Sequence, residues 1–313
     1  MKTVIVGTVA FDAIETPFGK TDRVVGGSAT YISLAASYFA GQANDPNIGI
    51  VSVVGDDFPQ EMIERFHAKG VDTAGMEVKA GEKSFFWSGK YHMDMNSRDT
   101  LVTDLNVLAD FDPVLPEDYR NADFLMLGNI DPNLQIKVIE QMRQRPKLIV
   151  MDTMNFWMDV AREPLDRAIG MVDVLTINDE EARQLSGEFS IVKGARKIMA
   201  MGPKYLIIKK GEHGALIFHG DRVFFAPALP LEDVFDPTGA GDTFAGGFLG
   251  HLVRTGDISF ENMKRAVIFG SSMASFCVEK FGPERLFELS EKEIDARVHA
   301  FIDLVQVDIQ LVS

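Results

Sequence analysis

The sequence predicts an α/β fold of three layers, in which helices cover both faces of a mostly parallel central sheet. Short apolar runs alternate with amphipathic stretches along most of the 313 residues, the pattern of repeated strand–helix–strand units. Hydrophobic residues make up 46% of the chain, enough to fill the core of such a fold. Since α/β folds of this length are often one large domain, we expect residues 1–313 to form a single domain.

Seven short apolar runs are the strand candidates: Val4–Val6, Ile48–Val54, Phe124–Leu127, Leu148–Met151, Val174–Ile177, Tyr205–Ile208 and Ala215–Phe218. The helix candidates lie near residues 28–40, 57–69, 132–144, 190–201, 241–254 and 261–277. The third begins with Asp131 and Pro132, an acidic cap followed by a proline in the first turn. In such a sheet, ligands bind at the carboxyl ends of the strands.

Two regions depart from this alternation. Residues 11–25 and 82–107 contain extended segments without a helical partner, most clearly residues 84–91. Segments that leave an α/β layer and return predict a small second sheet beside the ligand site, which would act as a lid and exclude water. The alternative is an additional antiparallel edge on the main sheet.

Charge and composition exclude several function classes. The net charge of −15 argues against a nucleic-acid or anionic-membrane partner, which would require a basic patch. Cys277 is the only cysteine, which leaves no intrachain disulfide, and its apolar neighbours predict a buried thiol. The first residues enter a strand without a signal-peptide pattern, and no segment is apolar enough to span a membrane. We therefore expect a cytoplasmic protein.

Several common catalytic motifs are absent. Residues 19–21 resemble the end of a P-loop, but Ile14 stands where that motif requires glycine. The turn after the first strand contains only Gly7, rather than the three glycines of a dinucleotide fingerprint, which opposes a dehydrogenase. The six histidines lack metalloprotease spacing, and no Gly-x-Ser-x-Gly elbow occurs.

Residues 236–248 are the most informative stretch of the chain. Gly239, Ala240 and Gly241 leave the backbone N–H groups open to a ligand, and apolar residues at helical spacing follow them. The positive end of such a helix binds a phosphate or a developing oxyanion. Asp242 adds a carboxylate that can accept a proton from an attacking hydroxyl. The alternative is that Asp242 only caps the helix and the glycines only form a turn.

Asn178 and Glu181 follow the strand candidate Val174–Ile177 and therefore stand at a carboxyl end. Three residues apart on a starting helix, they face the same side and can hold Mg²⁺ through water. The same spacing fits a capping box with Asn178 as the N-cap.

Two further segments carry glycines near strand ends. The segment with Lys209, Gly211 and Gly214 either brings a nucleotide close to the backbone or forms a hairpin into the next strand. Asp12 stands just past the first strand, and Gly26-Gly27 opens the helix near residue 28. A carboxylate beside paired glycines suits a polyhydroxy ligand, but a surface turn and a helix entry share the same pattern.

Taken in this order, the motifs resemble those of the ribokinase-like (PfkB) family of carbohydrate and nucleoside kinases, and the resemblance covers essentially the whole chain. It implies ATP-dependent transfer of a γ-phosphoryl group to a substrate hydroxyl, with ATP and Mg²⁺ as cofactors. In this resemblance, Asp242 matches the catalytic base of the family, and Gly239, Ala240 and Gly241 match its anion hole. Its Mg²⁺ and nucleotide positions map to Asn178, Glu181, Lys209, Gly211, Gly214, Thr238, Gly239 and Gly241. Asp12, Gly26 and Gly27 match substrate positions, and Asp236 falls where many members coordinate a monovalent cation such as K⁺.

The acceptor depends on positions where the chain departs from the sugar-specific members. Tyr31 and Ala10 stand where those members often carry asparagine, which weakens the case for ribose. Asn129 and Asn155 follow strands, and we expect them to contact the substrate instead. Four more residues are candidates for stacking or for contact with substrate or phosphate: Phe156, Trp157, Asn96 and Arg98.

We therefore expect a sugar kinase that uses Asp242 as its general base. A nucleoside kinase of the same family is the nearest alternative, followed by a catalytically silent ligand-binding relative. The expected partner is a small-molecule substrate, with no nucleic acid and no membrane. Exposed lid edges leave a monomer and a lid-mediated homodimer as alternatives.

Overall fold

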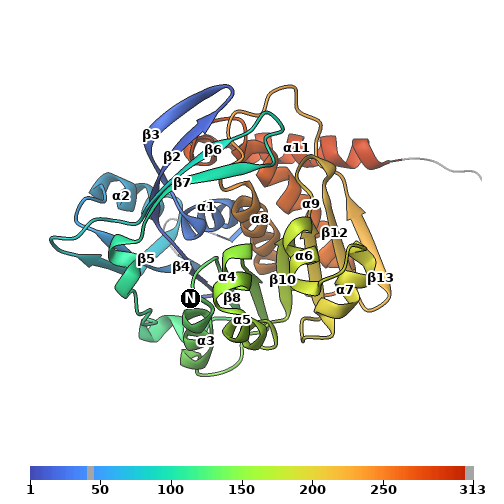
Figure 1. Cartoon of the computed structure of the whole chain (residues 1–313), viewed down its shortest axis with the longest axis horizontal. Coiled ribbons are helices and arrows are strands. Elements are labelled where there is room, and N and C mark those ends of the chain that lie inside the picture. The colour runs from blue at the N-terminus through green and yellow to red at the C-terminus, as the bar shows by residue number, and fades with distance from the viewer. Residues whose placement is uncertain (41–45, 307–313) are drawn as a thin grey trace, which may run out of the picture.

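The computed structural model describes residues 1–40 and 46–306, and its central sheet holds nine strands within those ranges (Figure 1). Their order across the sheet is β13-β12-β11-β10-β9-β8-β1-β4-β5. In chain order they are β1 (Thr3–Val6), β4 (Ile48–Gly55), β5 (Val71–Lys79), β8 (Phe124–Leu127), β9 (Leu148–Asp152), β10 (Val174–Asn178), β11 (Tyr205–Lys209), β12 (Ala215–His219) and β13 (Arg222–Ala226). All neighbouring pairs from β11 to β5 are parallel, and β12 and β13 extend one edge in antiparallel pairing.

Helices cover both faces of this sheet, so the predicted three-layer architecture is confirmed (Figure 1). Alternate residues of β1 enter two different apolar clusters, Ile5 on one face and Val4 and Val6 on the other. The helices are α1 (Ser28–Ala40), α2 (Gln60–Ala68), α3 (Pro132–Gln141), α4 (Asn155–Val160), α5 (Arg162–Ile169), α6 (Asp179–Ser186), α7 (Ile191–Met199), α8 (Ala240–Thr255), α9 (Phe260–Cys277), α10 (Glu284–Glu288) and α11 (Glu291–Val305). Short 3₁₀ turns cover Asn106–Asp110, Glu117–Tyr119 and Gly211–His213.

A second sheet of four strands stands apart from the first, in the order β3-β2-β6-β7. Its strands are β2 (Ala10–Thr16), β3 (Gly19–Gly26), β6 (Phe86–Tyr91) and β7 (Arg98–Asp104). The separate sheet expected from the two irregular regions is thus confirmed, and the alternative of an edge on the main sheet is wrong for these strands.

The predicted elements are all present, with small shifts at their ends. The helix expected from residue 57 begins at Gln60 because Pro59 is its N-cap, and the helix expected to reach residue 144 ends at Gln141. Asp131 caps α3 as predicted, since its side chain accepts a hydrogen bond from the Asn133 N–H. The thiol of Cys277 is buried, also as predicted. Within residues 1–40 and 46–306, no helix is long and apolar enough to cross a membrane.

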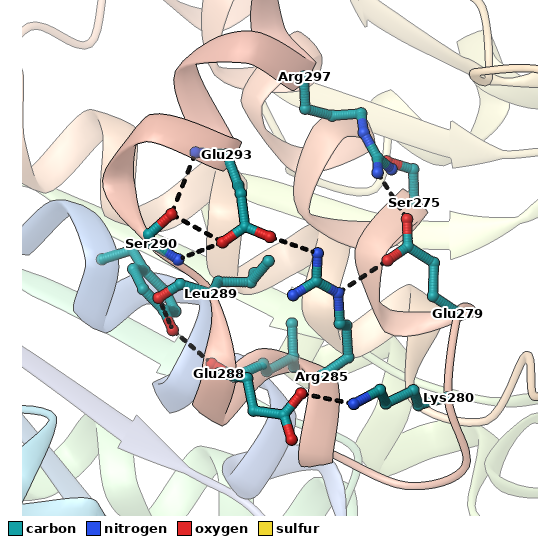
Figure 2. Close-up of polar contacts among 11 residues, drawn as sticks. Ser275, Glu279, Lys280, Arg285, Glu288, Leu289, Ser290, Glu293 and Arg297 are labelled. Atoms are coloured by element: carbon teal, nitrogen blue, oxygen red, sulfur yellow. Dashed lines mark hydrogen bonds and ion pairs between the residues drawn. The ribbon is translucent and has the colours of Figure 1, made fainter.

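An ion-pair network joins the C-terminal helices α10 and α11 to the end of α9 and the residues that follow it (Figure 2). Glu279 accepts hydrogen bonds from Arg285 at 2.8 Å and from Arg297 at 2.5 Å, and Arg285 also pairs with Glu293 at 2.8 Å. Ser290 and Glu293 form the capping box that starts α11. Because α9 packs along α8, this network supports the helix that carries the glycine-rich motif.

Candidate active site

The glycine-rich motif forms the first turn of α8. Gly239 is the N-cap residue in the left-handed region, with φ = 75°, and a Cβ there would lie 2.4 Å from the Tyr31 ring. Glycine is therefore required both by the backbone and by the contact. Asp242 lies in the first turn of α8 and is not its N-cap residue. The alternative that Asp242 serves only as the N-cap of this helix is therefore wrong.

Asp242 sits among charged groups that act on its titration. The pKa of Asp242 is raised to about 7, mainly by burial and also by the negative charge of Asp152, against the opposing charges of Lys209 and Arg98. A carboxyl with a pKa near neutrality has the proton affinity expected of a general base.

Three neighbouring parallel strands end in polar residues at the same edge: β9 in Asp152, β10 in Asn178 and β11 in Lys209. The Lys209 Nζ atom lies 2.7 Å from Asp152 Oδ2, and both side chains are largely buried. A Cβ on Gly241 would lie 3.0 Å from the same Nζ atom, so the lysine reaches the first turn of α8. The charges of Asp152, Glu181 and Asp242 all act on Lys209, and its predicted place in the nucleotide loop stays a prediction.

Asp152 is the site residue that our sequence reasoning did not select. The available signal was a carboxylate that ends a buried strand, as Asn178 does on the next strand. Its partner Lys209 is 57 positions away in the chain, so the pair becomes visible only once the strand order is known.

Asn178 and Glu181 form the capping box at the start of α6. The Asn178 N–H donates to Glu181 Oε2 at 2.7 Å, and the Glu181 N–H donates to Asn178 Oδ1 at 2.8 Å. Burial raises the pKa of Glu181 to about 7, while Lys209 lowers it. The capping interpretation is confirmed. The capping box uses Oε2 of the Glu181 carboxylate and does not need its other oxygen.

The donor set near Glu181 fits Mg²⁺ held through water and phosphate rather than by a protein cage. Among the described residues, no three His, Cys, Asp or Glu side chains gather closely enough to hold a metal ion. Mg²⁺ commonly keeps several waters and binds through one or two carboxylates and the substrate phosphates.

The segment after β11 forms the predicted hairpin into β12. Gly211 and Gly214 both have positive φ, 53° and 83°, and a Cβ on Gly214 would lie 2.1 Å from the Ala226 carbonyl oxygen. A Cβ on Gly211 would lie 2.2 Å from Asn96 Oδ1. The turn between β6 and β7 of the second sheet therefore touches this loop.

Asp12 lies on β2, beside the glycine pair that ends β3. A Cβ on Gly26 would overlap Asp12 Oδ2 at 1.9 Å, so the carboxylate fits only because Gly26 has no side chain. Burial raises the pKa of Asp12 to about 7, with further increases from Asp236 and Asp242. The structure thus brings Asp12 within the electrostatic influence of Asp242, and its role as a substrate residue stays a prediction.

Tyr31 and Asp236 lie beneath the glycine turn. Tyr31 is 1% exposed, and its hydroxyl has no hydrogen-bond partner in the described part of the chain. Asp236 accepts hydrogen bonds from the Thr238 N–H at 2.8 Å and from the Gly282 N–H at 2.9 Å. Thr238 in turn donates to the Tyr91 hydroxyl of the second sheet at 3.2 Å. The Tyr31 ring therefore packs against the turn, and its role as a substrate residue stays a prediction.

Asn129 and Trp157 are joined at the carboxyl ends of β8 and β9. The Trp157 indole N–H donates to Asn129 Oδ1 at 2.9 Å. Phe156 is 50% exposed, and its ring centre lies 4.9 Å from that of Trp157. Asn155 begins α4 beside them. The structure thus separates Phe156, which stays accessible, from Trp157, which is tied to Asn129.

The carboxyl edge of the parallel sheet presents the carboxylate of Asp152 and the cation of Lys209 beside the glycine-opened helix α8, an arrangement suited to phosphoryl transfer to a small molecule. The chain belongs to the pfkB family of carbohydrate kinases, whose family model matches residues 4–288. It is an ATP-dependent kinase that acts on a hydroxyl group, and the predicted family is confirmed.

Individual relatives agree with this assignment. A cytidine kinase from Thermococcus kodakarensis is 29% identical over 252 residues, which cover 79% of this chain and 86% of that protein. Two solved structures share the fold. A Burkholderia thailandensis nucleoside kinase in complex with inosine has a TM-score of 0.76 at 22% identity and covers 96% of this chain and 98% of its own. A protein from E. coli described as a ribokinase II, with ATP and Mg²⁺, has a TM-score of 0.76 at 18% identity and covers 95% and 99%.

Proposed function

We propose that the acceptor is a nucleoside, phosphorylated on a hydroxyl of its sugar. The observation that carries this choice is the half-exposed aromatic residue Phe156 in α4, just after β9, on whose ring a nucleobase would stack. The similarity to a cytidine kinase and to a nucleoside kinase with inosine supports it.

The proposed reaction begins at the acceptor hydroxyl. Its proton passes to Asp242, and its oxygen attacks the γ-phosphorus of ATP. The N–H groups of Gly239, Ala240 and Gly241 would donate to the transferring oxygens, aided by the positive end of α8. Asp12 would accept hydrogen bonds from sugar hydroxyls, and the second sheet would close over the site as a lid.

The proposed nucleotide site lies between the glycine turn and the hairpin loop. Lys209, Gly211, Gly214 and Thr238 would face ATP from these segments. Bound Mg²⁺ would neutralise phosphate charge, with Glu181 and Asn178 positioned to hold its waters.

A monovalent cation such as K⁺ is a further proposal, at Asp236. That carboxylate is 1% exposed and already orders two loops, so a cation beside it would offset its burial. Turnover in K⁺, Na⁺ and a bulky organic cation tests this: equal rates in all three would oppose it.

A free sugar is the second candidate acceptor, favoured by the buried carboxylate of Asp12 beside Gly26. A coupled ADP-release assay over nucleosides, sugars and sugar phosphates separates the two. We expect the highest kcat/KM with a nucleoside, and Phe156→Ala should raise the nucleoside KM about tenfold while sparing kcat. A sugar preferred over every nucleoside would contradict the proposal. No turnover with any acceptor would indicate the silent relative.

We expect the protein to work in the cytoplasm on a small molecule, without a nucleic-acid or membrane partner. We expect it to be either a monomer or a homodimer that pairs through the second sheet. β7 is exposed along its length, which leaves an edge that a second copy can pair with. The mass in solution, measured by light scattering, distinguishes the two states.

A further inference from the structure

Lys209 stands among the acidic residues of the site, where the family motifs give it only a place in the nucleotide loop. Lys209 ends β11, and its Nζ atom lies 2.7 Å from Asp152 Oδ2. Its charge acts on Glu181 and Asp242 as well as on Asp152, so the lysine faces three carboxylates that come from three different elements.

The ammonium group of Lys209 also lies close to α8, which indicates a role beyond neutralising the three carboxylates. A Cβ added to Gly241 would lie 3.0 Å from Lys209 Nζ, which places the cation against the turn whose N–H groups form the anion hole. A positive side chain and a helix N-terminus that converge on one point both favour a phosphate there.

We infer that Lys209 is a catalytic residue that binds the γ-phosphoryl group during transfer, and that Asp152 is the positioning residue that aims it. The inference deepens the phosphotransferase function and is independent of which acceptor is used. It changes the predicted role of Lys209 from a member of the nucleotide loop to a contact of the reacting group.

Phosphoryl transfer does not require the protonation state of Lys209 to change. The acceptor O–H gives its proton to Asp242, its oxygen forms a bond to the γ-phosphorus, and the bond from that phosphorus to the bridging oxygen breaks with its electron pair left on ADP. Lys209 stays protonated throughout and stabilises the charge on the transferring oxygens.

The geometry also explains why Asp152 is needed. A lysine side chain is long and flexible, and a fixed carboxylate restricts its ammonium group to one place. The Asp152 side chain is 8% exposed, and as the last residue of β9 it is held by the sheet.

The test compares nucleotide binding and turnover in Lys209→Met and Lys209→Arg. For Lys209→Met we expect kcat to fall on the order of 100-fold or more. ATP affinity should weaken about tenfold more than ADP affinity, the loss of one charged hydrogen bond to the γ-phosphate. Lys209→Arg should restore the preference for ATP in part because it keeps the charge. Binding is measured without acceptor, so an error in the acceptor assignment would leave this readout intact.

Two further variants control for folding. Lys204→Met removes an ion pair to the buried Asp173 (3.0 Å) just before the same strand begins, and it should keep kcat within about threefold of wild type. The double variant Asp152→Asn with Lys209→Met removes both partners of the ion pair, so neither is left without the other, and it should lose turnover as Lys209→Met does. Turnover within about threefold of wild type in the double variant, or equal weakening of ATP and ADP in Lys209→Met, would overturn the inference.

Discussion

At the scale of the residue, the chemistry depends on how Asp242 is surrounded. Burial and Asp152 raise its pKa to about 7, whereas Lys209 and Arg98 oppose that rise. The free enzyme should therefore lose kcat/KM as pH falls below about 7, because Asp242 becomes protonated and no longer accepts the hydroxyl proton.

Asp152→Asn should move the decline of kcat/KM at acid pH, the acid limb of the profile, to lower pH. The reason is that it removes a negative charge that raises the pKa of Asp242. The measurement is the pH profile of kcat/KM, with the exposed residue Asp166→Asn as a control that leaves the limb in place. A limb that stays in place or moves to higher pH in Asp152→Asn would contradict this electrostatic account.

The sequence identified most members of this cluster but not their arrangement. Asp242 and Glu181 each belong to a local motif, so a short stretch of sequence was enough to select them. Asp152 was missed because its importance comes from an ion pair with Lys209 across β10. Tyr31 stays a predicted substrate residue, and the packing of its ring under Gly239 is a relation that no local pattern contains.

At the scale of the element, the entry into α8 is the most constrained part of the fold. Gly239 and Gly256 bracket the helix, and both have positive φ, 75° and 67°. A Cβ on Gly239 would clash with the Tyr31 ring, whereas nothing lies within 4 Å of a Cβ on Gly256. The two positions thus share a backbone conformation that favours glycine but differ in steric contact.

Gly256→Ala should cost about 1 kcal/mol of unfolding free energy, from backbone strain alone. Gly239→Ala should cost roughly 2–4 kcal/mol and reduce turnover strongly, because the turn must move away from Tyr31. Urea unfolding and the ADP-release assay measure both quantities. Equal costs in the two variants, with turnover unchanged in Gly239→Ala, would contradict the account.

Strongly periodic or apolar elements were predictable, and polar or irregular ones were not. The seven apolar strands and the six helices expected from periodicity are all present. β5 was missed because its residues, VDTAGMEVK, mix polar side chains with a glycine, and α11 was missed because only Ile294 and Phe301 are buried along its length. α11 is instead held by the ion pairs of Arg285 and Arg297, which link it to α10 and to the segment that follows α9 and which no apolar periodicity reveals.

At the scale of the whole molecule, the site should weaken the fold at neutral pH. Asp12, Glu181 and Asp242 have pKa values raised to about 7 in the folded protein, against 3.8 for aspartate and 4.5 for glutamate in model compounds. The folded state therefore binds more protons than the unfolded state between these limits, and its stability falls as pH rises through about 7.

The melting temperature of the ligand-free protein should accordingly drop by several degrees between pH 5 and pH 8. Asp242→Asn should flatten this slope because it removes one of the three buried acids, and Asp166→Asn should not. Scanning calorimetry across that range provides the measurement. A melting temperature that rises steadily from pH 5 to pH 8 would show that the three acids are ionised without cost.

The central claim, that Asp242 is the base of a phosphotransferase, is tested most directly by Asp242→Asn. We predict that kcat falls by about 10³-fold or more, while ATP binding is retained. The melting temperature at pH 7.5 should be unchanged or higher, since burial disfavours the charge that is removed. Near-normal turnover in a folded Asp242→Asn protein would contradict the account.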